Sequence, residues 1–137
     1  MNIVVIDCLE RVYCRPDTTL EREDKPLFVP ENVGAYMYAP VVFLKVSKAG
    51  KCIGEKFAPR YYESIGWGLL LYDASLLEQG LAFASCEDRL SILPGPLYTK
   101  HTLESPDNVF EIKKDGKWIA PDDPESGLQY RSAGYTH

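Results

Sequence analysis

The sequence predicts a small, mainly β protein with a few short helices. Several short runs are rich in β-branched and aromatic residues, as strands are, and turns containing glycine or proline separate them. Residues at helical spacing occur only over short stretches. The length of 137 residues and a composition of 45% hydrophobic and 26% charged residues fit one soluble domain with a core of moderate size.

The first strands are expected at residues 1–6 and 41–46. Residues 1–6 are apolar, stop at Asp7 and lack a basic segment before them, so they fit a strand better than a signal peptide. Residues 41–46 form a β-branched and aromatic run that leads into a turn-forming segment. We therefore expect a hairpin whose returning strand begins at Cys52 and Ile53.

A short amphipathic helix is predicted over residues 55–65. Four of its residues follow spacings of three and four, which place them on one helical face: Ala58, Tyr61, Tyr62 and Ile65. The glycine-rich residues 66–68 are expected to end this helix. The apolar residues 69–72 then predict a buried strand.

One further helix and two turns complete the expected pattern. Ser75 and Glu78 have the spacing of a capping box, so a short helix is expected to begin there and to end near Gly80. Residues 94–96 (PGP) predict a turn between extended pieces. The pair Asp115-Gly116 between two apolar runs predicts a β-hairpin over residues 109–119.

The expected organisation is one β domain over residues 1–120 and a polar tail over residues 121–137. The tail is rich in turn-forming residues and has little apolar periodicity. Its acidic residues Asp122, Asp123 and Glu125 favour a solvated segment over a cation site, because no glycine-punctuated loop fixes them.

The net charge and the cysteines indicate which binding partners and which cellular compartment to expect. The formal net charge of −5 removes the usual attraction to phosphate backbones, so no nucleic-acid partner is expected. No apolar run approaches bilayer-spanning length, so no membrane insertion is expected either. The cysteines match no zinc spacing and are interpreted as reduced, small buried residues of a cytoplasmic protein: Cys8, Cys14, Cys52 and Cys86.

Residues 51–66 (KCIGEKFAPRYYESIG) resemble a run of the fumarylacetoacetate hydrolase family, G-K-x-I-x-E-K-F-A-x-x-Y-Y-x-x-I-G. Residues 15–20 (RPDTTL) resemble the family's K-P-D-T-A-L turn, and residues 93–96 and 109–118 resemble its later strands. The resemblance extends over about residues 12–119, and its middle run is the most specific part. It implies a β-roll, a fumarylacetoacetate hydrolase-like arrangement of mixed sheets that is usually dimeric.

Members of this family hydrolyse or decarboxylate small keto acids at a magnesium or manganese ion. Two glutamates in an E-x-E pair on one strand and an aspartate on the next strand hold the ion, since strand positions i and i+2 point to one face. The resemblance places Ala39 and Val41 at the glutamate positions and Leu70 near the aspartate position. These side chains have no oxygen, so no metal, no cofactor and no catalytic residue is expected. Pro40 is expected to disturb strand pairing locally.

Few polar residues remain as candidates for a site. The family's glycine-arginine-asparagine-tyrosine segment has no counterpart between Ile6 and Arg15, which also argues against its chemistry. Arg15 is retained as a ligand-binding residue for the carboxylate of a small keto acid, because the corresponding family turn lies near the substrate. His101, with Glu104 and Asp107 nearby, is interpreted as part of an ordinary turn region.

Three functional hypotheses stay open. The first is a catalytically inactive, fumarylacetoacetate hydrolase-like protein that acts as a small-ligand binding or subunit-like protein. The alternative is a hydrolase or decarboxylase of acylpyruvate-type keto acids, working alone or beside an active partner chain. The third is an unrelated ligand-binding module that has kept only the scaffold. A homo-oligomer, most simply a dimer, is expected, with large aromatic residues as contact area: Tyr61, Tyr62 and Trp67.

Overall fold

The computed structural model describes residues 2–7, 9–23, 25–107, 113–114 and 116–118. Over these residues the fold is mainly β with short helices, as expected, and its strands form three sheets. The elements in chain order are β1 (Ile3–Ile6), β2 (Val12–Arg15), the 3₁₀ helix η1 (Asp17–Thr19), β3 (Leu20–Glu21), β4 (Tyr36–Val46), the 3₁₀ helix η2 (Glu55–Arg60), β5 (Tyr62–Asp73), α1 (Ala74–Gln79), α2 (Leu81–Ala84), β6 (Ser91–Ile92), β7 (Tyr98–Thr99), the 3₁₀ helix η3 (Lys100–Glu104), β8 (Lys113–Lys114) and β9 (Lys117–Trp118).

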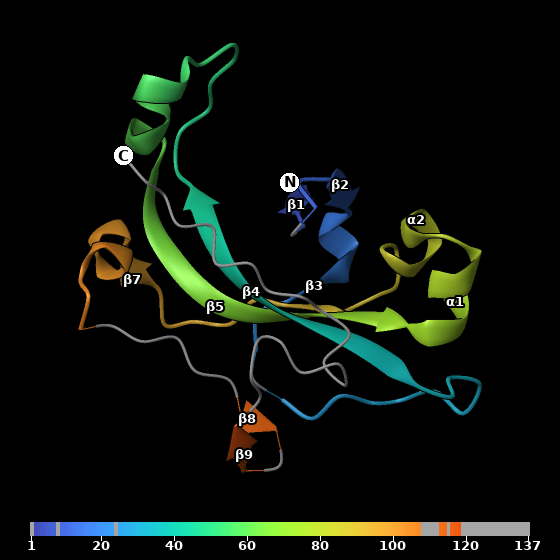
Figure 1. Ribbon diagram of the computed structural model, residues 1–137. Coiled ribbons are helices and arrows are strands. Elements are labelled where there is room, and N and C mark those ends of the chain that lie inside the picture. The colour runs from blue at the N-terminus through green and yellow to red at the C-terminus, as the bar shows by residue number, and fades with distance from the viewer. Residues whose placement is uncertain (1, 8, 24, 108–112, 115, 119–137) are drawn as a thin grey trace.

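An antiparallel ribbon of β4 and β5 forms the centre of the fold. It is long and strongly curved, with α1 and α2 at one end and η2 at the other (Figure 1). Strands β6 and β7 pair with β5 at two separate places, and β3 pairs in parallel with β6. The hairpin of β1 and β2 lies on the concave side of the ribbon (Figure 1).

The core lies where the hairpin, the ribbon and the two α-helices meet. Its buried members are Ala39, Leu70, Tyr72 and Ala84. Partly buried residues from all of these elements, and from the segment after β6, pack against them: Val5, Tyr13, Val41, Leu76, Leu77, Leu81 and Leu93. The predicted strands at residues 1–6, 41–46 and 69–72 are therefore confirmed as parts of β1, β4 and β5.

The expectation that Pro40 disturbs the pairing is wrong. Pro40 lies inside β4 opposite Leu69, and the register continues through it; the one irregularity falls between Lys45 and Val46. In the described part of the sheet β4 is an edge strand. Proline is tolerated in edge strands because its nitrogen can face away from the partner strand.

The segment between β4 and the middle of β5 differs from the prediction at two places. Cys52 and Ile53 form no returning strand, and the return begins only at β5. The predicted helix over residues 55–65 is limited to the short η2, because residues 62–65 already belong to β5, and residues 66–68 continue that strand. A β carbon at Gly66 would collide with the ring of Phe43, and one at Gly68 would lie 2.7 Å from the Ile92 carbonyl oxygen. Glycine here permits close approach of neighbouring chain segments and does not end a helix.

The second predicted helix is confirmed as α1, with a different N-cap. The Asp73 Oδ1 atom accepts hydrogen bonds from the Ser75 backbone nitrogen at 2.9 Å and from the Ser75 hydroxyl at 2.7 Å. Asp73 therefore caps the helix, and Ser75 belongs to its first turn. Gly80, with a φ of 146°, ends α1 and begins α2.

The predictions for the C-terminal third are confirmed where the structure describes them. Residues 93–97 form an irregular link with a bend at Gly95 between β6 and β7, and β8 pairs with β9 around Gly116, whose φ is 78°. The remaining residues of the predicted 109–119 hairpin, and the tail 121–137, lie outside the described residues. No helix in the described part of the chain is long and apolar enough to cross a membrane.

Candidate functional site

Arg15 is fully buried at the end of β2. The strand alternates, so that Val12 and Cys14 face outward while Tyr13 and Arg15 face inward. Pro16 follows directly and begins the turn at η1. The sequence therefore places a charged side chain at an inward position, where an apolar residue is the ordinary choice.

The guanidinium group of Arg15 has only part of the partners it needs. Its Nη2 atom donates a hydrogen bond to the Leu71 carbonyl oxygen at 3.0 Å, and its carbon lies 4.7 Å from the centre of the Tyr72 ring. Its Nε and Nη1 atoms are buried without a hydrogen-bond partner. A buried cation is costly unless an acceptor or an anion compensates it. Within the described residues Arg15 forms no ion pair, so two of its buried donors lack an acceptor there.

Two tyrosines stand beside this guanidinium group. The hydroxyl groups of Tyr13 and Tyr72 share a short hydrogen bond between β2 and β5. Burial raises the pKa of Tyr13 well above its usual value, and the hydrogen bond to Tyr72 adds to the shift. The Tyr13 hydroxyl therefore stays protonated at neutral pH and provides a neutral hydrogen-bonding group near Arg15.

Glu87, which follows α2, is the second ionisable group of the site. Its Oε2 atom is buried without a hydrogen-bond partner. Burial raises the pKa of Glu87, and the charge of Asp73 raises it further, while Arg15 opposes both effects. Arg15 and Glu87 therefore influence each other electrostatically, although neither is hydrogen-bonded to the other.

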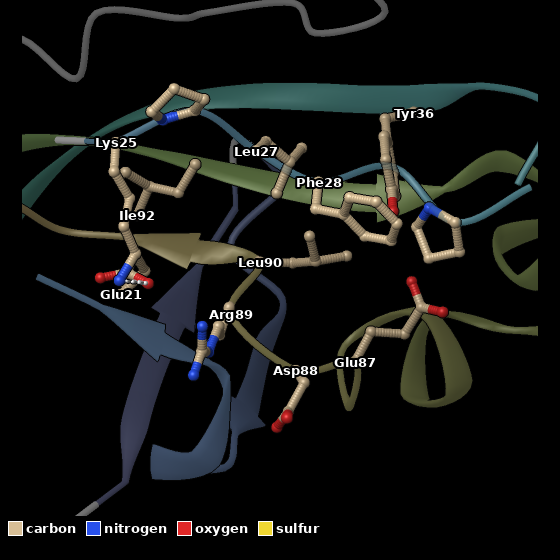
Figure 2. Close-up of a pocket in the computed structure, with 12 residues that line it drawn as sticks. Glu21, Lys25, Leu27, Phe28, Tyr36, Glu87, Asp88, Arg89, Leu90 and Ile92 are labelled. Atoms are coloured by element: carbon tan, nitrogen blue, oxygen red, sulfur yellow. Dashed lines mark ion pairs between the residues drawn. The ribbon is translucent and has the colours of Figure 1, made fainter. Parts of the chain in front are cut away.

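Glu87 also lines a cleft of about 410 Å³ between the segment after β3 and the segment that leads into β6. Figure 2 shows Glu87 and Tyr36 pointing toward each other at one end, with Phe28 and Leu90 forming apolar walls beside them. Burial and the charges of Glu87 and Asp73 raise the pKa of Tyr36. At the other end Lys25 pairs with Glu21 at 3.3 Å. The cleft thus has apolar walls and ionisable groups at both ends.

Arg15 itself does not line the cleft, because its side chain has no exposed surface. A ligand in the cleft meets Glu87 first. The unpartnered donors of Arg15 are buried and are not part of the lining of the cleft. The structure therefore describes a closed arrangement around Arg15 with an open cleft beside it.

The three positions that the resemblance assigned to metal ligands lie together in the core. Ala39 on β4 is directly opposite Leu70 on β5, and Val41 is two residues further along the face of β4 that carries Ala39. All three offer only hydrocarbon, which does not fit a hard dication that needs oxygen ligands. Tyr72, on the same face of β5 as Leu70, carries the Arg15 guanidinium group over its ring. Arg15 therefore contacts Tyr72, which belongs to the same core cluster as Ala39 and Leu70.

The other polar residues that the sequence singled out do not join the site around Arg15. Asp122, Asp123 and Glu125 lie outside the described residues. His101 Nδ1 lies 2.9 Å from an oxygen of Glu104 on the exposed η3, and a turn follows at residues 106–107. No group of three or more histidine, cysteine, aspartate or glutamate side chains lies together in the part of the chain that the structure describes.

The interpretation of the cysteines as buried residues is wrong for three of them. Cys14, Cys52 and Cys86 are free thiols with exposed surface, while Cys8 lies outside the described residues. Cys14 faces outward because it alternates with the buried Arg15, and Cys52 lies in the loop before η2. Tyr61, Tyr62 and Trp67, expected as contact area, are partly buried.

Sequence reasoning missed Glu87, Tyr36 and Tyr13. Glu87 occurs in an unremarkable polar stretch, SCED, and only the packing of α2 brings it toward Arg15. For Tyr13 a signal was present. Tyr13 lies two positions before Arg15 in the same strand, so both side chains point to the same face, opposite to Cys14.

Comparison with known proteins identifies no relative, since no family model, curated protein or solved structure matches the chain.

Proposed function

We propose that this chain is a fumarylacetoacetate hydrolase-like β-roll protein that binds a small carboxylic acid at Arg15 without cleaving it. The observation that carries the proposal is the fully buried guanidinium group of Arg15, which retains two unpartnered donors. A carboxylate oxygen is an acceptor that can form a charge-assisted hydrogen bond with such a donor. Keto acids of the acylpyruvate type form the ligand class that the family resemblance suggests.

The absence of oxygen at the former ligand positions supports binding over turnover. Ala39 and Leu70 face each other in the core, and neither can hold a dication. Cleavage or decarboxylation of a keto acid needs stabilisation of an enolate, which is worth several kcal/mol at a metal-dependent site. Arg15 can bind the carboxylate of such an acid, but a single cation does not chelate it.

The residues around Arg15 give the binding site a defined response to pH. Because the pKa of Glu87 is raised, lowering the pH protonates Glu87 earlier than an ordinary glutamate. A protonated Glu87 removes a negative charge from the vicinity of Arg15 and becomes a hydrogen-bond donor. Affinity for a carboxylate is therefore expected to rise as the pH falls through the pKa of Glu87.

Calorimetric titration of the protein with pyruvate and with oxaloacetate tests the proposal. Methyl pyruvate, which lacks the carboxylate charge, is the ligand control. Arg15→Met should abolish the binding, while Arg11→Met, a change at an exposed arginine of the same hairpin, should leave it unchanged. Acid binding that survives Arg15→Met would refute the assigned residue. Cleavage of an acylpyruvate by the purified chain with magnesium or manganese would favour the enzyme alternative.

A further inference from the structure

The β1–β2 hairpin carries apolar residues on both of its faces. Its inner face carries Val5 and Tyr13, which pack against the core cluster. Its outer face is formed by two cross-strand pairs, Val4 with Cys14 and Ile6 with Val12. Antiparallel strands that face water normally alternate apolar residues inward and polar residues outward. The outer face therefore has the composition of a covered surface.

This face is nevertheless open in the single chain. Val4 is 60% exposed, Ile6 is 70% exposed and Val12 is 65% exposed. Leu9, in the turn that joins the two strands, is 69% exposed, and Cys14 is exposed as well. In the described part of the chain β1 and β2 pair only with each other, so no third strand continues this sheet.

We infer that this outer face, here called the hairpin face (Val4, Ile6, Leu9, Val12 and Cys14), packs against the same face of a second copy of the chain. The arrangement is isologous, with a two-fold axis that passes between the two hairpins. It covers the surface of each hairpin with an identical apolar surface. The inference does not depend on the proposed acid binding, because the side chain of Arg15 lies on the opposite face of the hairpin.

Charge favours a second copy at this place. The chain has a net charge of −5, so two copies repel each other over most orientations. No strand position of the hairpin face is charged. Asp7 and Arg11, at the turn end of the hairpin, compensate each other through an ion pair at 2.6 Å. Glu10 lies in the turn and outside the strands. Like charges are therefore largely kept away from the two-fold axis.

The exposed area is small and corresponds to a weak, transient contact. At roughly 80 Å² of apolar surface for each of the four aliphatic side chains, two hairpin faces would bury on the order of 650 Å². An interface of standard size buries about 1,600 Å², of which about 900 Å² is apolar. The hairpin faces thus supply about two-thirds of the apolar area of a standard interface. We expect a dimer that dissociates at micromolar concentration.

Sedimentation velocity on the full chain, under reducing conditions and from about 5 to about 500 µM, measures the association. The wild type should shift from monomer to dimer within this range. Val12→Lys places a charge of each copy close to its symmetry mate and should weaken association at least tenfold. Val46→Lys is the matched control, because Val46 is an equally exposed strand valine on β4 and the charge change is identical. It should dimerise like the wild type.

Thiol reactivity gives a second readout that locates the interface. In a variant with Cys8→Ser, Cys52→Ser and Cys86→Ser, only Cys14 reacts with a maleimide. The reaction should slow as the protein concentration rises through the dissociation constant, and adding Val12→Lys should restore the fast rate. A wild type that stays monomeric throughout, equal weakening by Val46→Lys, or a Cys14 reaction rate independent of concentration would overturn the inference. Loss of association with intact acid binding leaves the proposed function standing.

Discussion

Replacing Arg15 with methionine separates the binding role of this residue from a structural one. Methionine is similar in length, is unbranched and fits a buried site against an aromatic ring. The change removes the cation, the hydrogen bond to the Leu71 carbonyl oxygen and the contact with the Tyr72 ring. It also removes the two buried donors, Nε and Nη1, that have no partner.

The favourable and unfavourable effects of Arg15→Met on the free energy of unfolding are of similar size. The hydrogen bond from a charged donor contributes about 1.5–3 kcal/mol, and the desolvated cation–π contact contributes up to about 2 kcal/mol. Each of the two unpartnered donors costs about 1–3 kcal/mol. A sulfur–aromatic contact with Tyr72 returns about 0.3–1.5 kcal/mol. We therefore expect Arg15→Met to change the free energy of unfolding by less than about 2 kcal/mol in either direction.

Urea unfolding followed by circular dichroism measures this difference. The same experiment at saturating pyruvate should stabilise the wild type by about 2.7 kcal/mol at one hundred times the dissociation constant, and should not stabilise Arg15→Met. If Arg15 were instead half of a buried ion pair, its removal would cost about 3–5 kcal/mol. A loss of that size, with no effect of the acid on the wild type, would refute the reasoning.

Three further outcomes are expected. Gly68→Ala should lower the free energy of unfolding by about 1–3 kcal/mol in a thermal melt, because its β carbon would meet the Ile92 carbonyl oxygen, whereas Gly34→Ala, with nothing within 4 Å, should be nearly neutral. Because the pKa of Glu87 is raised in the folded state, stability should fall as the pH rises from the ordinary glutamate range through the raised value; Glu87→Gln should flatten that part of the pH profile. Calorimetric titration with magnesium or manganese should give no binding, and micromolar affinity would contradict the assignment of Ala39, Val41 and Leu70.

The strands that are rich in apolar residues could be predicted from the sequence. The structure of the segment between residues 46 and 69 could not be predicted in this way. Residues 41–46 and 69–72 are rich in apolar residues and were located correctly within β4 and β5. Tyr61, Tyr62 and Ile65 fit a helical period and a strand equally well over so short a stretch. The pairing with β4 decides the outcome, since Ile65 lies opposite Leu44 in the ribbon. The spacing of neighbouring residues in the sequence does not reveal this distant strand partner.

The candidate site was predictable only in part for the same reason. Arg15 was identified from a resemblance, and its burial follows from the alternation of β2 against the core. Glu87 and Tyr36 approach each other because the start of β4 lies near the segment that follows α2 (Figure 2). Neither residue belongs to a motif, so the sequence gives no reason to associate them.

The residues that the resemblance aligns with metal ligands help to build the core. In the family that the sequence resembles, carboxylates at the corresponding positions hold a metal ion. Here Ala39 and Leu70 are buried against each other and Tyr72 and Ala84 complete the cluster. A buried carboxylate without its ion is strongly destabilising, whereas hydrocarbon at these positions adds to the burial that holds a chain of 137 residues together. Arg15 is a charged side chain buried beside that packing, and its unpartnered Nε and Nη1 atoms are the donors that the proposed acid ligand would use.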